Sequence, residues 1–144
     1  VPALCPHANW VRNMEFVLLS PKNGIIVRIF AGALVAMTFG VLRWSDLQRS
    51  VELKLGKDAL MGMSNMKKKI HLTSWVAPRV GLTNQDWARV WVALLTQYGM
   101  PGEDFILLRP KKDMKGFTAK PAEHTDITTV LRLILMKPPF SMSA

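Results

Sequence analysis

The chain has 144 residues, 49% of them hydrophobic, so it is long enough for one compact domain with a core and too short for two. Nineteen Lys and Arg against ten Asp and Glu give a formal net charge of +9, which excludes an acidic surface and favours a polyanionic partner. Nucleic acid is favoured over an acidic membrane because scattered basic side chains release counterions from phosphates. A basic surface without a partner is the alternative.

The cysteine content bears on location. Cys5 is the single cysteine, which excludes an intrachain disulfide and a cysteine-based zinc site. We therefore expect a reducing, intracellular compartment, the nucleus in a eukaryote and the cytoplasm otherwise. The histidines His7, His71 and His124 lack metal-ligand spacing, so no metal site and no cofactor are expected.

Two helices are predicted in the first third of the chain. Residues 9–19 carry apolar side chains at helical spacing, and the sequence from Ser20 to Gly24 is typical of a turn. Residues 25–42 form the most hydrophobic segment and predict a buried helix, because Arg28 leaves too short an uncharged run for a membrane span. A membrane anchor formed by residues 25–42 is the less favoured interpretation.

Residues 51–76 predict a small antiparallel sheet with basic turns. Apolar and charged residues alternate from Val51 to Leu55, the sequence Gly56-Lys-Asp58 is typical of a turn, and residues 60–63 supply a second strand. A third strand is expected at about residues 68–76, ended by the sequence Ala77-Pro78.

Two more helices are predicted after the sheet, at about residues 84–98 and 126–136. The first begins with a capping-box-like sequence, Thr83 to Asp86, and the second ends at Pro138-Pro139. Between them, residues 105–108 predict a short strand or extended segment and residues 109–121 a basic loop. The sequence thus predicts a mainly α fold with a small three-stranded antiparallel sheet (α+β), in one domain or fragment spanning residues 1–144.

Arg43 is the first candidate site residue, since it stands at the end of the hydrophobic helix with Asp46 three residues on. Ser45 or Asp46 is expected to cap a short helical continuation toward Arg49. A guanidinium in this place can bind a phosphate through two hydrogen bonds. The alternative is that Arg43 caps carbonyls at the helix end and pairs with Asp46.

Two groups of basic residues are candidate DNA-binding residues. In the predicted sheet, we expect one face to carry five lysines, Lys54, Lys57, Lys67, Lys68 and Lys69. A lysine there can also protonate a leaving hydroxyl if neighbouring positive charge lowers its pKa. The second group lies in the predicted basic loop and comprises Arg109, Lys111, Lys112, Lys115 and Lys120. The alternative for the sheet lysines is a solvated charge cluster on an edge strand. The alternative for the second group is a plain mobile loop.

The motifs resemble those of the tyrosine recombinases, or phage-integrase family, especially divergent copies from mobile elements. Residues 30–46, FAGALVAMTFGVLRWSD, are similar to the family's apolar helix that ends in a catalytic arginine followed by an acid. Residues 62–70, GMSNMKKKI, stand where the family has the catalytic lysine, and residues 75–91 resemble the segment that leads into the next helix. The resemblance implies the catalytic core of the DNA breaking-rejoining enzymes, with Arg43, Asp46 and Lys67 or Lys68 at its site.

The resemblance covers only the first half of such a catalytic domain. The family's second active-site box needs a His-x-x-Arg motif and then a nucleophilic tyrosine, but the sequence from His124 to Ile127 lacks the arginine and no tyrosine follows Tyr98. The resemblance implies that Arg43 holds the scissile phosphate and that the lysine protonates the 5′ hydroxyl in intact relatives. We therefore expect a fragment that binds duplex DNA without cleaving it, completed by a missing C-terminal half or by other protomers.

The alternative from another functional class is a basic helical module that binds RNA or a protein partner, with the tryptophans Trp44, Trp75, Trp87 and Trp91 forming its core.

Overall fold

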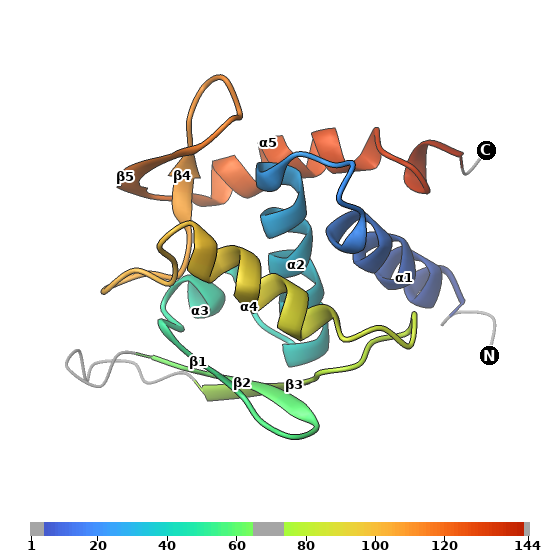
Figure 1. The fold of residues 1–144 in the computed structure, drawn as a ribbon, viewed down its shortest axis with the longest axis horizontal. Coiled ribbons are helices and arrows are strands. Elements are labelled where there is room, and N and C mark those ends of the chain that lie inside the picture. The colour runs from blue at the N-terminus through green and yellow to red at the C-terminus, as the bar shows by residue number, and fades with distance from the viewer. Residues whose placement is uncertain (1–4, 65–73, 143–144) are drawn as a thin grey trace.

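The computed structural model describes residues 5–64 and 74–142, which form helices and strands in an α+β arrangement (Figure 1). The helices are α1 (Cys5–Leu19), α2 (Ile25–Gly40), α3 (Trp44–Gln48), α4 (Trp87–Gln97), α5 (His124–Leu135) and the 3-10 turn η2 (Phe140–Met142). The strands are β1 (Glu52–Leu55), β2 (Ala59–Met63), β3 (Ser74–Pro78), β4 (Leu108–Pro110) and β5 (Phe117–Pro121). The predicted combination of helices with a small three-stranded antiparallel sheet is confirmed.

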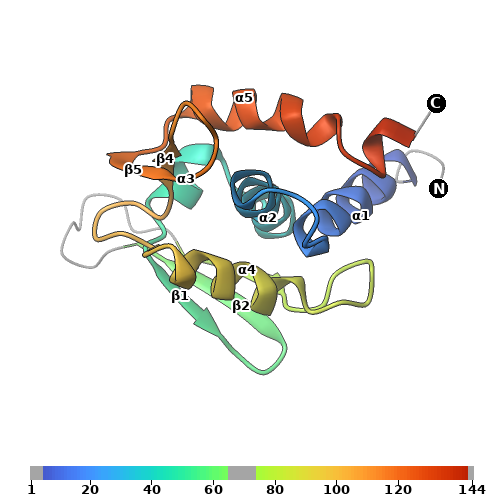
Figure 2. The same ribbon diagram turned by 45° about the horizontal axis from the view of Figure 1, so that its top comes forward.

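The hydrophobic segment forms α2, the central helix of the fold. A helix that is apolar on nearly every side needs neighbours all around it, and α2 contacts α1, α3, α4, α5 and β3. Figure 2 shows α2 nearly end-on between α5 and α4, with α1 beside it. Within the described part of the chain, no helix combines the length and the apolar character needed to cross a membrane.

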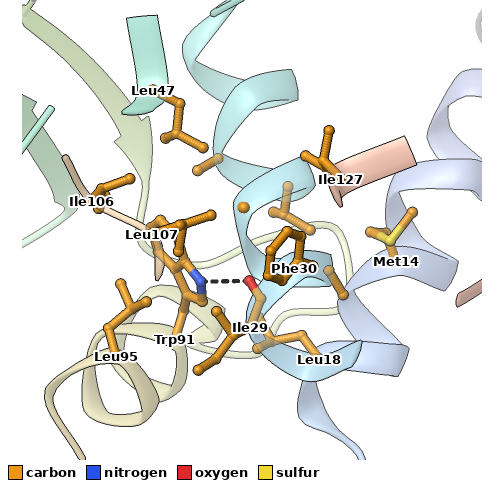
Figure 3. Packing of buried hydrophobic residues seen from close by; sticks show 14 of the residues in the cluster. Met14, Leu18, Ile29, Phe30, Leu47, Trp91, Leu95, Ile106, Leu107 and Ile127 are labelled. Atoms are coloured by element: carbon orange, nitrogen blue, oxygen red, sulfur yellow. Dashed lines mark hydrogen bonds between the residues drawn. The ribbon is translucent and has the colours of Figure 1, made fainter. Parts of the chain in front are cut away.

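Tryptophan side chains of α4 close the core against α2. Trp87 and Trp91 are fully buried, and the Nε1 of Trp91 donates a hydrogen bond of 2.9 Å to the backbone oxygen of Ile29 (Figure 3). This close approach depends on Gly32, because a Cβ atom there would lie 2.1 Å from Cδ1 of Trp91. Both tryptophans lie in the helix predicted at residues 84–98, but the sequence did not indicate their partner.

The three strands β1, β2 and β3 form an antiparallel sheet in that order. Strand β3 lies at residues 74–78, so Ala77 and Pro78 are strand residues rather than its stop, and the rest of the expected strand at 68–76 lies largely outside the described residues. Pro78 is tolerated because it is the last residue of an edge strand. Gly62 makes room for the Trp75 indole, which a Cβ atom would approach to 2.2 Å.

The segment expected as a basic loop at residues 109–121 forms a second, two-stranded sheet. Strands β4 and β5 pair antiparallel, with Leu108 opposite Pro121 and Pro110 opposite Phe117. Strands this short, and flanked by prolines, carry too little alternation to be recognised from sequence. The hairpin also shortens the connection before α5, which begins at His124 because the backbone N–H of Glu123 donates to the Asp126 carboxylate at 2.7 Å.

The connection between β3 and α4 is held by carboxylates. Asp86, rather than Thr83, is the N-cap of α4, and its Oδ1 accepts a hydrogen bond from the Arg89 backbone at 3.1 Å. Glu15 of α1 is fully buried, and its carboxylate accepts hydrogen bonds from the backbone of Leu82 (2.9 Å) and from the Thr83 hydroxyl (2.8 Å). These contacts fix the connection between β3 and α4 to α1.

Candidate functional site

Arg43 lies at the sharp turn between α2 and α3. Helix α2 ends at Gly40, and Val41 follows in the left-handed region with φ 54°. The backbone N–H of Leu42 donates back to the Met37 carbonyl at 2.9 Å, which terminates the helix in the manner of a Schellman motif. Arg43 is then the extended N-cap residue of α3.

The contact between Arg43 and Asp46 runs through the backbone. The Arg43 N–H donates to Oδ2 of Asp46 at 3.4 Å, a long hydrogen bond, and the carboxylate stands in the first turn of α3, where it complements the helix dipole. The Arg43 guanidinium is exposed, and it makes no hydrogen bond or ion pair with any described residue. The proposed side-chain pair of Arg43 with Asp46 is therefore absent, and the guanidinium is available to a ligand.

An open hollow lies beside Arg43. It has a volume of about 660 Å³ and is lined by side chains of α2 and of the turn after it: Leu34, Met37, Thr38, Val41, Leu42 and Arg43. Its walls are mostly apolar, with the guanidinium as the one charged group among the lining residues. The arrangement suits an anion with apolar or stacked neighbours better than a free inorganic ion.

A chain of hydrogen bonds fixes α3 to the sheet. The Nε1 of Trp75 on β3 donates to the Ser50 hydroxyl at 2.8 Å, and this hydroxyl donates to the Asp46 backbone oxygen at 2.7 Å. Ser50 is fully buried and Trp75 is nearly so, which protects both bonds from water. Arg43 therefore holds a fixed position relative to β3.

The structure describes only two of the five lysines that were expected on one face of the sheet, Lys54 and Lys57. Lys54 is exposed on the outward face beside Met61, and Lys57 is exposed in the β1–β2 turn. That turn and Ser64, the last described residue before the gap, lie at opposite ends of β2. Lys67, Lys68 and Lys69 fall outside the described residues. The expectation that all five lysines share one face of the sheet therefore stays a prediction.

The second basic group divides into paired and unpaired residues. Arg109 on β4 donates to Asp126 at 3.0 Å and to Glu123 at 3.1 Å, and the hydrogen bond with Asp126 is the main reason that its pKa is raised. Two carboxylates thus neutralise Arg109. The lysines of the hairpin are exposed and have no carboxylate partner among the described residues: Lys111, Lys112, Lys115 and Lys120.

Groups that could carry other chemistry are isolated. Tyr98 ends α4 and packs edge-on against Phe117, with ring centroids 5.8 Å apart. His124 is exposed at the start of α5, whereas the side chain of His7 and all of His71 lie outside the described residues. Within the described part of the chain, no three His, Cys, Asp or Glu side chains gather as a metal site would require.

Sequence reasoning missed Gln48, which joins α3 to the second hairpin. Its Nε2 donates to the backbone oxygens of Leu107 (3.0 Å) and Ala122 (2.8 Å), and its Oε1 accepts from the Leu107 N–H at 2.8 Å. These partners lie 59 and 74 residues away in sequence, so no local pattern signals them. Gln48 therefore brings the basic hairpin next to the helix that begins beside Arg43.

Comparison with protein-family models, curated proteins and solved structures gives no match for this chain.

Proposed function

We propose that this chain binds duplex DNA through its phosphate backbone, as a fragment of the tyrosine-recombinase type that does not cleave. One observation carries the proposal. The Arg43 guanidinium is exposed and unpaired among the described residues, on a backbone fixed by α2, Asp46 and the Trp75–Ser50 hydrogen bonds. Because the backbone at Arg43 is already held, binding a phosphate has to order only the Arg43 side chain.

The order of elements supports the resemblance seen in the sequence. An apolar helix ending before Arg43 is followed by Asp46 on a short helix, then by a three-stranded antiparallel sheet, and the sheet's second connection carries the lysines. This is the order that the recombinase resemblance implies. Binding without cleavage is proposed because Tyr98 packs against Phe117 and the sequence supplies no other tyrosine.

The test is fluorescence anisotropy of a labelled DNA duplex across a salt series. We expect Arg43→Ala to weaken binding about tenfold at low salt, the loss of one charge-assisted contact, and to reduce the salt slope by about 1. Lys22→Ala is the matched control, because Lys22 is an exposed lysine in the turn before α2, at the opposite end of that helix. The thermal stability of both variants should equal that of the wild type.

Two results would overturn the proposal. The first is a folded wild type that does not bind duplex DNA at low salt. The second is an Arg43→Ala variant that binds no more weakly than Lys22→Ala, because Arg43 would then contribute no more than its share of the net charge.

A protein-binding module is the second candidate, and the outward face of the sheet favours it. Met61, Met63 and Val76 are 36%, 43% and 60% exposed, and the first two line a hollow of about 490 Å³ together with Lys54. If Arg43→Glu binds DNA as well as the wild type does, while Met61→Ser removes capture of a protein partner, this candidate replaces the first.

A further inference from the structure

We propose that the β4–β5 hairpin is a second nucleic-acid contact, a basic two-stranded ribbon that binds phosphates along a groove of the duplex. The inference rests on the proposed function, since it assigns a second contact to the same partner. The hairpin rises from the body of the fold next to the start of α5 (Figure 1).

The charge of the hairpin is carried by lysines that have no carboxylate to pair with among the described residues. Between Pro110 and Pro121 the sequence has four lysines, Lys111, Lys112, Lys115 and Lys120, and one acid, Asp113. The Oδ1 of Asp113 accepts a hydrogen bond from the Lys115 backbone at 2.9 Å, so this carboxylate shapes the turn. All four lysines are exposed.

The base of the hairpin is fixed to the rest of the molecule. Gln48 binds the backbone on both sides of it, at Leu107 and Ala122, and the Ala122 N–H donates to the Leu107 carbonyl at 3.0 Å. The ring of Phe117 packs against Tyr98. A hairpin held in this way presents its lysines without the entropy cost of ordering a loop.

Arg109 is a positioning residue in this arrangement. Its guanidinium binds Asp126 and Glu123 at the start of α5, which ties β4 to that helix. Because two carboxylates occupy it, Arg109 is not expected to bind phosphate. The hairpin contact is therefore assigned to the lysines, which bind phosphates as point charges and give no sequence preference.

The geometry favours duplex nucleic acid as the partner. A two-stranded ribbon fits the major groove, which is about 12 Å wide. Arg43 precedes α3 and Gln48 ends it, about 8 Å apart along the helix axis, so the base of the hairpin lies near the Arg43 backbone. The proposal therefore assigns one duplex to both contacts. A lipid surface fits less well, because the hairpin turn offers Met114, half-buried, as its one large apolar side chain.

The first experiment compares two triple variants of equal charge change. Lys112→Gln/Lys115→Gln/Lys120→Gln removes hairpin charge, and Lys22→Gln/Arg89→Gln/Arg132→Gln removes exposed charge from the α1–α2 turn, α4 and α5. We expect the hairpin variant to reduce the salt slope for a DNA duplex by about 2, the loss of at least two phosphate contacts, and the control to leave the slope nearly unchanged.

The second experiment locates the contact directly. In a Cys5→Ser background, Lys115→Cys carrying a photoactivated cross-linker should attach to labelled duplex, whereas Lys22→Cys should not. Equal cross-linking at both positions, or equal salt slopes for the two triple variants, overturns the hairpin contact.

The two proposals fail separately. Loss of binding in Arg43→Ala without any effect of the hairpin variant overturns the second contact and leaves the first. If the hairpin variant weakens binding and Arg43→Ala does not, the Arg43 contact is overturned and the hairpin contact remains. Co-sedimentation with anionic vesicles that the hairpin variant abolishes, while duplex binding persists, would reassign the hairpin to a lipid surface.

Discussion

Val41 is the β-branched residue among the described non-glycine residues with positive φ. It is 90% exposed and has φ 54°, a left-handed conformation that is disfavoured for β-branched residues. We expect Val41→Gly to raise the free energy of unfolding by about 0.5–1 kcal/mol, since the relieved strain exceeds the entropy gained by the unfolded chain. Urea denaturation followed by tryptophan fluorescence measures this change.

Val80→Gly is the matched control for this substitution. Val80 is also exposed, but it is absent from the described residues with positive φ, so glycine there increases only the entropy of the unfolded chain and should lower stability. If Val41→Gly destabilises as much as Val80→Gly does, Val41 is not strained.

At the residue scale, sequence reasoning predicted where Arg43 lies along the fold better than it predicted side-chain contacts. Arg43 was identified from its place after an apolar run, and it does follow the end of α2. Its contact with Asp46 through the backbone was not predictable, because that depends on the N-cap geometry of α3. Glu15 gave no signal at all, since its hydrogen-bond partners Leu82 and Thr83 lie 67 and 68 residues away.

Among the elements, the end of β3 and the start of α4 are joined by an ion pair that should respond to pH. Arg79 donates to Asp86 at 2.6 Å and to the Gly56 carbonyl at 3.0 Å. The hydrogen bond from Arg79 is the main reason that the pKa of Asp86 is lowered. The folded state therefore gains stability from the ionised carboxylate above the ordinary Asp pKa, about 3.9, and loses it as the pH falls through the lowered value.

Asp86→Asn tests this linkage, because asparagine can still cap α4 but cannot form the ion pair. We expect the variant to melt a few degrees below the wild type at pH 7, and the difference to shrink once the pH falls below about 4. Asp58→Asn, at an exposed carboxylate in the β1–β2 turn, should show a much smaller difference. If the difference in melting temperature between the wild type and Asp86→Asn stays constant down to pH 2, the ionised Asp86 carboxylate does not have the stabilising role assigned to it.

The elements that sequence predicted well are the helices with a long, clear pattern. Helix α2 is an almost uninterrupted apolar run and α4 has apolar residues at helical spacing, so both were recognisable in the sequence. The β4–β5 hairpin did not, because β4 has three residues and its position depends on Gln48. The basic residues were visible in the sequence, but only the structure separates the ion-paired Arg109 from the exposed lysines.

For the whole molecule, the decisive feature is how closely the elements approach α2. Sequence predicted that this helix is buried, but not which neighbours it has. Four elements besides α3 pack on it, and the Trp91 indole of α4 lies against Gly32. The site depends on this packing, because the same helix ends beside Arg43 and its end contacts β3.

One substitution at two positions tests this dependence. Gly32→Ser puts a side chain where the Trp91 ring lies, so α2 and α4 must separate and the Trp91 hydrogen bond to Ile29 must break. We expect a loss of about 3 kcal/mol in the free energy of unfolding.

Gly24→Ser is the control. Gly24 is the N-cap of α2, where a Cβ atom would meet nothing within 4 Å beyond its chain neighbours and a serine hydroxyl can cap the helix. Thermal unfolding followed by circular dichroism should therefore show a much lower melting temperature for Gly32→Ser and a slightly higher one for Gly24→Ser. An equal, small effect at both glycines would mean that α4 is not held against α2 at this point, and the fixed geometry of Arg43 would lose its support.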